Sequence, residues 1–321
     1  MAEILIPEVL VSSAIDDLRA RFDVAYLPDL WKNPEALAAE VKNTRVLIVR
    51  TFTRVTHAIL HAGTRLQLVG RAGVGLDNID VDAAEKAGIV VAYTPSQNAI
   101  SVAEMTIGLM IALTRHICVA NQDTHSRGWN RTRYFGPELY GKKLGIIGAG
   151  RIGFLTGKRA QAFGMEIVAN DPYLSEDNIY LSELRAKLVS LDDLLAESDI
   201  VSCHVPLTEE TKGLLNRHRF QQMKSTAYLI NTSRGPVIDE VALVEALKAG
   251  QIAGAALDVR STEPPAASDL EGMANVILIP HIASFTHEAQ ERVTRAICED
   301  VVRFLEGKPV QQPATSFSFP R

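Results

Sequence analysis

The stretch LGIIGAGRIG, residues 144–153, decides how the chain is expected to fold. Its glycines Gly148, Gly150 and Gly153 have the spacing G-x-G-x-x-G, which by itself is a weak signal in a chain with 21 glycines. KLGII, before them, has the pattern of a buried strand, and RIGFLTGKRAQAFG, after them, has apolar residues at helical spacing. A second strand, EIVAN (166–170), is followed by Asp171, 18 residues beyond Gly153. Together these features predict a dinucleotide-binding βαβ unit.

Each part of this unit has a mechanical use. Gly148 permits the tight turn, Gly150 lets the backbone approach a pyrophosphate, and Gly153 lets the helix pack against the strand. The N-terminus of the helix faces the negative charge of the phosphates. Asp171 can accept hydrogen bonds from the adenosine ribose, and its carboxylate would repel a 2′-phosphate. The predicted cofactor is therefore NAD rather than NADP.

On both sides of this unit, short β-branched runs alternate with helical patterns. Runs without clean alternation are typical of parallel strands that helices cover on both faces. We therefore expect an α/β protein with two Rossmann-like, doubly wound parallel-sheet domains and a cleft between them. The expected strands are residues 3–6, 22–26, 45–50, 66–70 and 89–93 in the first domain, and six in the second, residues 143–148, 166–170, 199–205, 227–231, 254–259 and 276–280.

The domain boundaries follow from the end of the chain. Segment 286–307 has an amphipathic helical pattern, and its apolar side needs a partner that the small first domain can supply. We therefore predict a discontinuous, flavodoxin-like substrate domain, residues 1–97 plus 285–321, and an NAD-binding domain, residues 98–284. The poorly patterned end, 311–321, is expected to be mobile.

Composition narrows the classes of function. With 321 residues, 47% of them apolar and 22% charged, the chain is typical of a soluble globular protein. Its net charge of −5 and the lack of a basic stripe argue against nucleic-acid and membrane partners. The apolar stretch 100–119 carries Glu104 and two further ionisable residues, so a buried helix is expected there. Cys118, Cys203 and Cys298 are isolated, which predicts free, buried or semi-buried thiols, no metal site and a cytoplasmic location.

Three polar residues follow later strands of the second domain: Arg234 in NTSRG, Glu263 in RSTEPP and His281 in IPHIAS. Ligands of open parallel sheets lie beyond the carboxyl ends of the strands, so all three side chains could reach one crevice. Each alone could have a structural role, as a turn arginine, a solvated carboxylate or a packing histidine. Their common placement makes them candidates for one reacting site.

Four motifs occur in the same order as in a known family: VGRAGVGLDNIDVDAAEKAGIVV (69–91), GRIG, NTSRGPVIDEVALVEALKAGQIAGAALDV (231–259) and PHIAS (280–284). With them the chain resembles the D-isomer-specific 2-hydroxyacid dehydrogenases over roughly residues 40–310. D-3-phosphoglycerate dehydrogenases and hydroxypyruvate/glyoxylate reductases look most similar. The resemblance implies an NAD-dependent oxidoreductase that transfers a hydride between the nicotinamide and C2 of a 2-keto/D-2-hydroxy acid pair.

The resemblance also implies roles for individual residues. His281 matches the proton donor and acceptor, Glu263 the carboxylate that holds the histidine and favours its charged form, and Arg234 the arginine that grips the substrate. The positions that match cofactor-binding residues are Val74, Gly148, Gly150, Arg151, Ile152, Gly153, Asp171, Val205, Pro206, Thr211, Thr232, Ser233, Asp258 and Ala283. Those that match substrate-binding residues are Arg50, Val74, Gly75, Arg131 and Arg234.

Segment 98–140 resembles the dimer-forming arm of the family, so a homodimer is expected. Two features depart from the family pattern. Arg260 stands where the family usually has a phenylalanine, which puts local packing and substrate preference in doubt. The chain also ends near residue 321, so we expect no regulatory domain of the kind that many phosphoglycerate dehydrogenases carry.

Other functions of the same fold stay open. A formate dehydrogenase would need glutamine in place of Glu263, because formate has no hydroxyl proton to move. A phosphite-oxidising relative keeps all three reacting residues. A corepressor-like protein that senses NAD(H) can keep them too, although such proteins tend to carry long disordered extensions.

Overall fold

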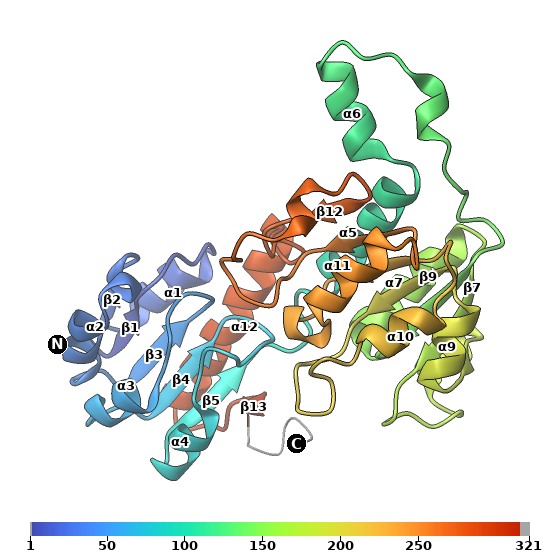
Figure 1. Cartoon of the computed structure of the whole chain (residues 1–321). Helices are drawn as coiled ribbons and strands as arrows, with labels where there is room; N and C mark the ends of the chain where they lie inside the picture. Colours follow the sequence, from blue (N-terminus) through green and yellow to red (C-terminus); the bar gives the residue numbers. More distant parts are fainter. Residues whose placement is uncertain (1, 315–321) are drawn as a thin grey trace. The chain divides into compact units, whose positions relative to one another are not determined.

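The computed structural model describes residues 2–314 and divides into two compact units. One unit combines Met1–Asn98 with Phe285–Arg321, and the other is Ala99–Ser284. Each unit is a sheet with helices on both faces (Figure 1). The predicted fold class, two doubly wound parallel-sheet α/β domains, is confirmed.

The unit Ala99–Ser284 contains a seven-stranded sheet in the order β12-β11-β10-β9-β6-β7-β8, with every neighbouring pair parallel. The strand order reverses between β6 and β9, which makes this pair the topological switch point. The strands are β6 (Lys143–Ile147), β7 (Glu166–Asn170), β8 (Lys187–Leu188), β9 (Ile200–Cys203), β10 (Tyr228–Asn231), β11 (Gly254–Leu257) and β12 (Val276–Leu278).

Successive residues of these strands enter two different apolar cores. Ile147, Val201 and Leu229 pack on one face with α9, α10 and α11, whereas Ile146 and Ile230 pack on the other with α5, α7 and α8. Burial on both faces explains why the strands are apolar without alternation. The helices are α5 (Ala99–Thr114), α6 (Ile117–His125), α7 (Arg151–Ala162), α8 (Ile179–Leu184), α9 (Leu191–Glu197), α10 (Arg217–Gln222) and α11 (Glu240–Lys248), with 3₁₀ turns η2 (Arg131–Tyr134), η3 (Gly235–Val237) and η4 (Asp269–Gly272).

The other unit has a six-stranded sheet in the order β13-β5-β4-β3-β1-β2, parallel except for β13. Helix α12 (His287–Leu305) packs Val293, Ile297 and Val301 on one face of this sheet together with α1, and α2, α3 and α4 cover the other face. The remaining elements are β1 (Ile4–Ile6), α1 (Ala14–Arg21), β2 (Val24–Tyr26), η1 (Leu30–Lys32), α2 (Pro34–Val41), β3 (Val46–Val49), α3 (His57–Ala62), β4 (Leu68–Arg71), α4 (Val81–Lys86), β5 (Val90–Tyr93) and β13 (Pro313–Ala314).

Several expectations from the sequence were wrong in detail. The second sheet has seven strands rather than six, because the two-residue strand β8 pairs with β7. Strand β13 lies in the segment that was expected to be mobile, where it pairs with β5, and residues 315–321 lie outside the described residues. Cys118 is exposed rather than buried or semi-buried.

The apolar stretch 100–119 is not one buried helix. Helix α5 is largely buried, but the backbone of His116 takes a left-handed conformation (φ 54°) that ends it, and no residue of α6 is buried. Helix α6 projects from its unit, as Figure 1 shows. Within residues 2–314 no single helix is long and apolar enough to cross a membrane, although α5 and α6 pass that test as a pair bent by 62°.

Candidate active site

The predicted site residues of the unit Ala99–Ser284, apart from Arg131, lie beyond the carboxyl ends of its parallel strands. In the order of the strands across the sheet, Asp171 follows β7, the glycine loop follows β6 and Val205 follows β9. Arg234 then follows β10 and His281 follows β12. Because carboxyl ends of parallel strands share one edge of a sheet, the sheet itself brings these residues to one edge.

The glycine loop is shaped by close contacts that a side chain would prevent. Gly148 has a φ of 89°, and a Cβ there would lie 2.8 Å from the carbonyl oxygen of His204. A Cβ on Gly153 would lie 2.3 Å from the carbonyl oxygen of Gly148. A Cβ on Gly150, the N-cap of α7, would instead meet no other atom within 4 Å. The loop is therefore packed tightly on its inner side and open at the helix N-terminus, which is the shape that a pyrophosphate requires.

Asp171 is tied to this loop. Its Oδ2 accepts a hydrogen bond from the Ala149 backbone N–H (3.0 Å), and its Oδ1 accepts one from the Tyr173 N–H (3.0 Å). Each carboxylate oxygen retains a second lone pair, so the group can still accept from a ribose hydroxyl. Arg151 and Ile152 begin α7 directly after Gly150.

The predicted cofactor-binding residues beyond β9 and β10 lie in two ordered turns. Thr211 donates from its hydroxyl to the Pro206 carbonyl (2.6 Å), which closes the turn after Val205. Thr232 and Ser233 are buried at the end of β10, where the hydroxyl of Thr232 pairs with that of Thr106 in α5 (2.9 Å). These contacts hold in place the turn that follows β9 and the turn that follows β10.

The sequence did not single out Asn231 and His204 at these strand ends, because both look like ordinary strand residues. Asn231 accepts hydrogen bonds from the backbone N–H and the hydroxyl of Ser233 and donates to the Arg234 carbonyl (3.0 Å), so it shapes the turn that carries Arg234. Burial lowers the pKa of His204 to about 3, so its ring is neutral. Among the described residues its Nδ1 is buried without a hydrogen-bond partner, while Nε2 lies 2.9 Å from the Ser202 hydroxyl.

His281 and Glu263 form a direct pair. His281 Nδ1 lies 2.7 Å from Glu263 Oε2, and the two side chains are 39% and 40% exposed, so the pair is accessible to a ligand. Burial raises the pKa of Glu263, but the hydrogen bond and charge of His281, the Arg260 N–H and the charge of Arg234 together bring it below its usual value. Glu263 is therefore ionised at neutral pH.

The backbone of His281 is held in an unusual conformation. Its φ is 54°, in the left-handed region that residues with a Cβ rarely adopt. The buried Asp258 carboxylate accepts from the N–H groups of the next two residues, Ile282 (2.7 Å) and Ala283 (3.1 Å), and the Asp258 carbonyl accepts from the His281 N–H (2.7 Å). Burial outweighs these bonds and raises the pKa of Asp258. Asp258 thus fixes the turn that carries His281.

Three predicted residues belong to the other unit, and each follows one of its central strands. Arg50 follows β3, and its guanidinium stacks over the Phe285 ring at 4.4 Å. Burial lowers the pKa of Arg50, although the charge of Glu8 opposes this effect. Val74 and Gly75 lie in the loop after β4, where Arg71 donates to the Gly75 carbonyl (2.9 Å).

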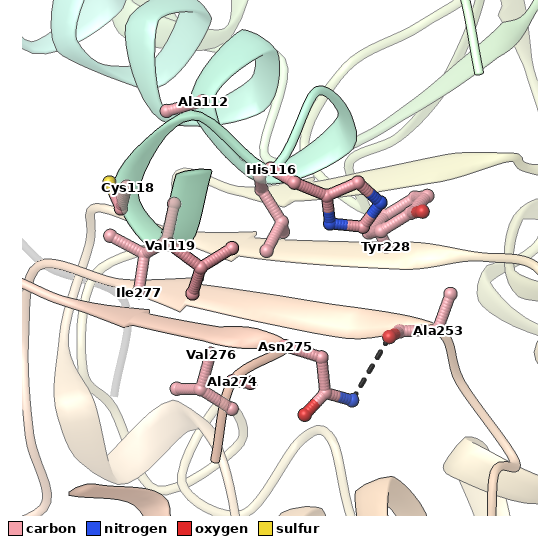
Figure 2. A pocket seen from close by; sticks show the side chains of 11 residues that line it. Ala112, His116, Cys118, Val119, Tyr228, Ala253, Ala274, Asn275, Val276 and Ile277 are labelled. Atoms are coloured by element: carbon pink, nitrogen blue, oxygen red, sulfur yellow. Dashed lines mark hydrogen bonds between the residues drawn. The ribbon is translucent and has the colours of Figure 1, made fainter. Parts of the chain in front are cut away.

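The opposite edge of the seven-stranded sheet, at the amino ends of its strands, carries a small cavity instead of the predicted site residues. A cavity of about 30 Å³ lies there, lined by the start of β10 and β12 and by the α5–α6 junction (Figure 2). Figure 2 shows His116, Tyr228 and Asn275 among mostly apolar side chains, and Asn275 donates to the Ala253 carbonyl (3.0 Å). This volume accommodates water molecules but not a dinucleotide. Arg131 also lies away from the strand ends, on the exposed turn η2 that follows α6.

Comparison with known proteins adds independent findings. Residues 107–283 match the family model of the D-isomer specific 2-hydroxyacid dehydrogenase, NAD binding domain. The D-3-phosphoglycerate dehydrogenase of Bacillus subtilis (strain 168) is 43% identical over 304 residues, and that of Archaeoglobus fulgidus is 41% identical over 311. These alignments cover 94% and 96% of this chain but 58% of each relative, so the chain spans less than two thirds of their length.

Solved structures agree over nearly all of this chain. D-lactate dehydrogenase from Aquifex aeolicus, solved in complex with NAD and lactic acid, is 32% identical with a TM-score of 0.84, covering 95% of this chain and 96% of that one. A glyoxylate reductase from Paecilomyes thermophila is 28% identical with a TM-score of 0.87, covering 97% of each chain.

Proposed function

The chain belongs to the D-isomer-specific 2-hydroxyacid dehydrogenase family, and from this premise we propose that it transfers a hydride between NAD and C2 of a 2-keto/D-2-hydroxy acid pair. The observation that carries the proposal is the His281–Glu263 pair, with Nδ1 and Oε2 2.7 Å apart, at the same sheet edge as the glycine loop. A proton-transfer group beside a dinucleotide site is what oxidation of a hydroxyl group requires.

The glycine loop fits the cofactor. Gly150 leaves open space at the N-terminus of α7, where backbone N–H groups can bind phosphate, and Asp171 can accept from a ribose. When bound, NAD supplies the hydride acceptor, and NADH the donor. The other residues proposed to contact it are Val74, Arg151, Ile152, Val205, Pro206, Thr211, Thr232, Ser233, Asp258 and Ala283.

In the proposed reduction, His281 gives a proton from Nε2 to the substrate carbonyl oxygen, and in oxidation it takes the proton back. Glu263, which is ionised, stabilises the protonated imidazole through Nδ1. The guanidinium of Arg234 binds the substrate carboxylate and carbonyl, for which its planar fork is suited. Arg50, Val74, Gly75 and Arg131 are proposed as further substrate contacts, on the family resemblance alone.

A homodimer is part of the same proposal. The arm formed by α6 and η2 exposes apolar side chains, with Trp129 79% and Phe135 82% exposed. Pairing with a second copy would remove them from water. The expected result of light scattering at micromolar concentration is a dimer, and a monomer would contradict this part. We also propose a cytoplasmic location, which the three free thiols support.

The decisive experiment is a substrate panel. Glyoxylate, hydroxypyruvate, phosphohydroxypyruvate, pyruvate and bulkier 2-keto acids are each assayed with NADH and NADPH, next to formate and phosphite with NAD. Turnover of at least one 2-keto acid, better with NADH, is expected. Turnover of formate or phosphite alone would replace the proposed substrate class. NADH binding without any turnover would instead favour a nucleotide-sensing protein.

A further inference from the structure

Arg260, where the family usually has an aromatic residue, is almost completely buried. Its side chain is only 8% exposed, although a charged group is costly to bury without partners. Two carboxylates compensate for its charge: Glu240, itself 15% exposed, and Glu271. Where the family usually has apolar packing, Arg260 therefore forms an ion-pair network.

The network joins three separate segments. Arg260 Nε and Nη2 donate to Glu240 Oε2, both at 3.3 Å, and Glu240 is the first residue of α11. Nη1 donates to Glu271 Oε1 in η4 (2.8 Å), and Nη2 also donates to the Ser268 hydroxyl (3.0 Å). The hydrogen bond from Arg260 is the main reason why the pKa of Glu271 is lowered to about 2. That ion pair therefore stays charged across the neutral pH range.

The same network holds the loop that carries Glu263. The Ser261 N–H donates to Glu240, and the Arg260 N–H donates to Glu263 Oε1 (3.3 Å). The loop also lies directly on the turn after Arg234, because a Cβ on Gly235 would lie 1.8 Å from the Arg260 carbonyl oxygen. The Glu263 side chain itself is 40% exposed, so packing alone does not fix its direction.

We propose that Arg260 is a positioning residue for proton transfer: by clamping residues 260–263 to α11 and η4, it keeps the Glu263 carboxylate aligned with His281 Nδ1. This proposal rests on the proposed function. Arg260 touches neither His281 nor the reacting atoms, so its effect must pass through Glu263. A role confined to folding would lower stability without changing how the His281–Glu263 pair titrates.

The first test is Arg260→Met, which keeps an apolar stem and removes the donors. We expect kcat/KM for keto-acid reduction to fall about 10-fold, because a misplaced carboxylate no longer supports protonated His281. The basic limb of the pH profile should move to lower pH, in the same direction as in Glu263→Gln. Arg260→Lys keeps the charge but cannot bond all partners at once, so it should restore part of the lost activity.

Lys248→Met is the matched control. Lys248 of α11 pairs with Asp269 of η4, so this ion pair joins the same two elements, but its side chains are 57% and 64% exposed. Its removal should leave the pH profile unchanged. If Arg260→Met does not fold, Glu240→Gln takes its place, since glutamine can still accept from Ser261. A smaller shift in the same direction is then expected.

A double variant separates positioning from general damage. Because Arg260 acts through Glu263, Arg260→Met should add almost nothing to the pH shift of Glu263→Gln when both are combined. Fully additive losses, or an unshifted basic limb in Arg260→Met, would overturn the proposal.

The positioning role of Arg260 can also be tested without enzymatic turnover. If no keto acid is turned over, the titration of His281 is followed by NMR in the full-length protein, with the ring signals assigned by comparison with His281→Ala. Arg260→Met should move the midpoint of this titration to lower pH, and Lys248→Met should not. Equal midpoints in wild type and Arg260→Met would overturn the positioning role independently of catalysis.

Discussion

At the ends of β6, β7 and β9 the backbone itself forms most of the candidate site, whereas at the ends of β10, β11 and β12 charged side chains form it. We call these the nucleotide half and the catalytic half of the sheet edge. In the nucleotide half, the contacts of Gly148 and Gly153 leave no room for a Cβ. In the catalytic half, Glu263 and His281 are about two fifths exposed and take their positions from hydrogen bonds.

The difference is explained by the role that we propose for each half. A pyrophosphate is bound by backbone N–H groups at close range, so steric fit decides. Proton transfer needs a group whose protonation state is set by nearby charge, so electrostatics decides. Substitutions in the nucleotide half should therefore act independently of pH, and those in the catalytic half should change the pH profile.

The largest expected effect is in the catalytic half. His281→Ala removes the proposed proton donor and acceptor, so kcat/KM should fall roughly 10²-fold or more in both directions. Dinucleotide affinity, measured by fluorescence titration, should stay within about twofold of the wild-type value, since the substitution leaves the nucleotide half unchanged. A parallel loss of affinity would show that the two halves are not separable.

Gly153→Ala tests steric fit in the nucleotide half. The added Cβ would lie 2.3 Å from the Gly148 carbonyl oxygen, so the loop must shift. The free energy of unfolding should fall by about 1–3 kcal/mol, and dinucleotide binding should weaken at every pH. Gly150→Ala is the control, because its Cβ meets nothing within 4 Å. It should weaken binding with little change in unfolding, and equal destabilisation by both would contradict the steric explanation.

Glu263→Gln tests electrostatics with little change of shape. The hydrogen bond and charge of His281 help to lower the pKa of Glu263, and by reciprocity the carboxylate favours protonated His281. Without this charge the protonated imidazole loses its stabilising partner, so the basic limb of the reduction profile should move to lower pH, while oxidation gains relative ground at low pH. The measurement is kcat/KM against pH in both directions. An unmoved basic limb would return Glu263 to the role of a solvated loop residue.

The smallest expected effect concerns cofactor preference. Asp171→Ala should narrow the kcat/KM advantage of NADH over NADPH by about 5-fold, the value of one hydrogen bond of about 1 kcal/mol. Asp171→Asn can keep an acceptor for the Ala149 N–H, so it separates loss of charge from loosening of the glycine loop. A wild-type enzyme that already prefers NADPH would show that Asp171 does not select the cofactor.

Much of this architecture could be predicted from residue patterns. The apolar runs of β6, β9 and β10 indicated parallel strands buried on both faces, and each such strand lies between two cores. The glycine spacing indicated the loop after β6, since a close backbone approach can be met only by residues without a side chain. Residues that follow apolar strands identified Arg234, Glu263 and His281 as candidates, because parallel topology brings strand ends to one edge.

Short elements and charged contacts could not be predicted in this way. Strand β8 has two residues and β13 two, too few for a periodic pattern, so each exists only because a neighbouring strand offers hydrogen bonds. The surroundings of Arg260 could not be predicted, since its partners Glu240 and Glu271 lie 20 and 11 residues away and only the fold brings them to it. The sequence by itself determined the buried strands and the glycine loop, because both depend on local patterns of residues. The tertiary structure decided which charges meet, because ion pairs depend on distances of a few ångströms that local patterns do not encode.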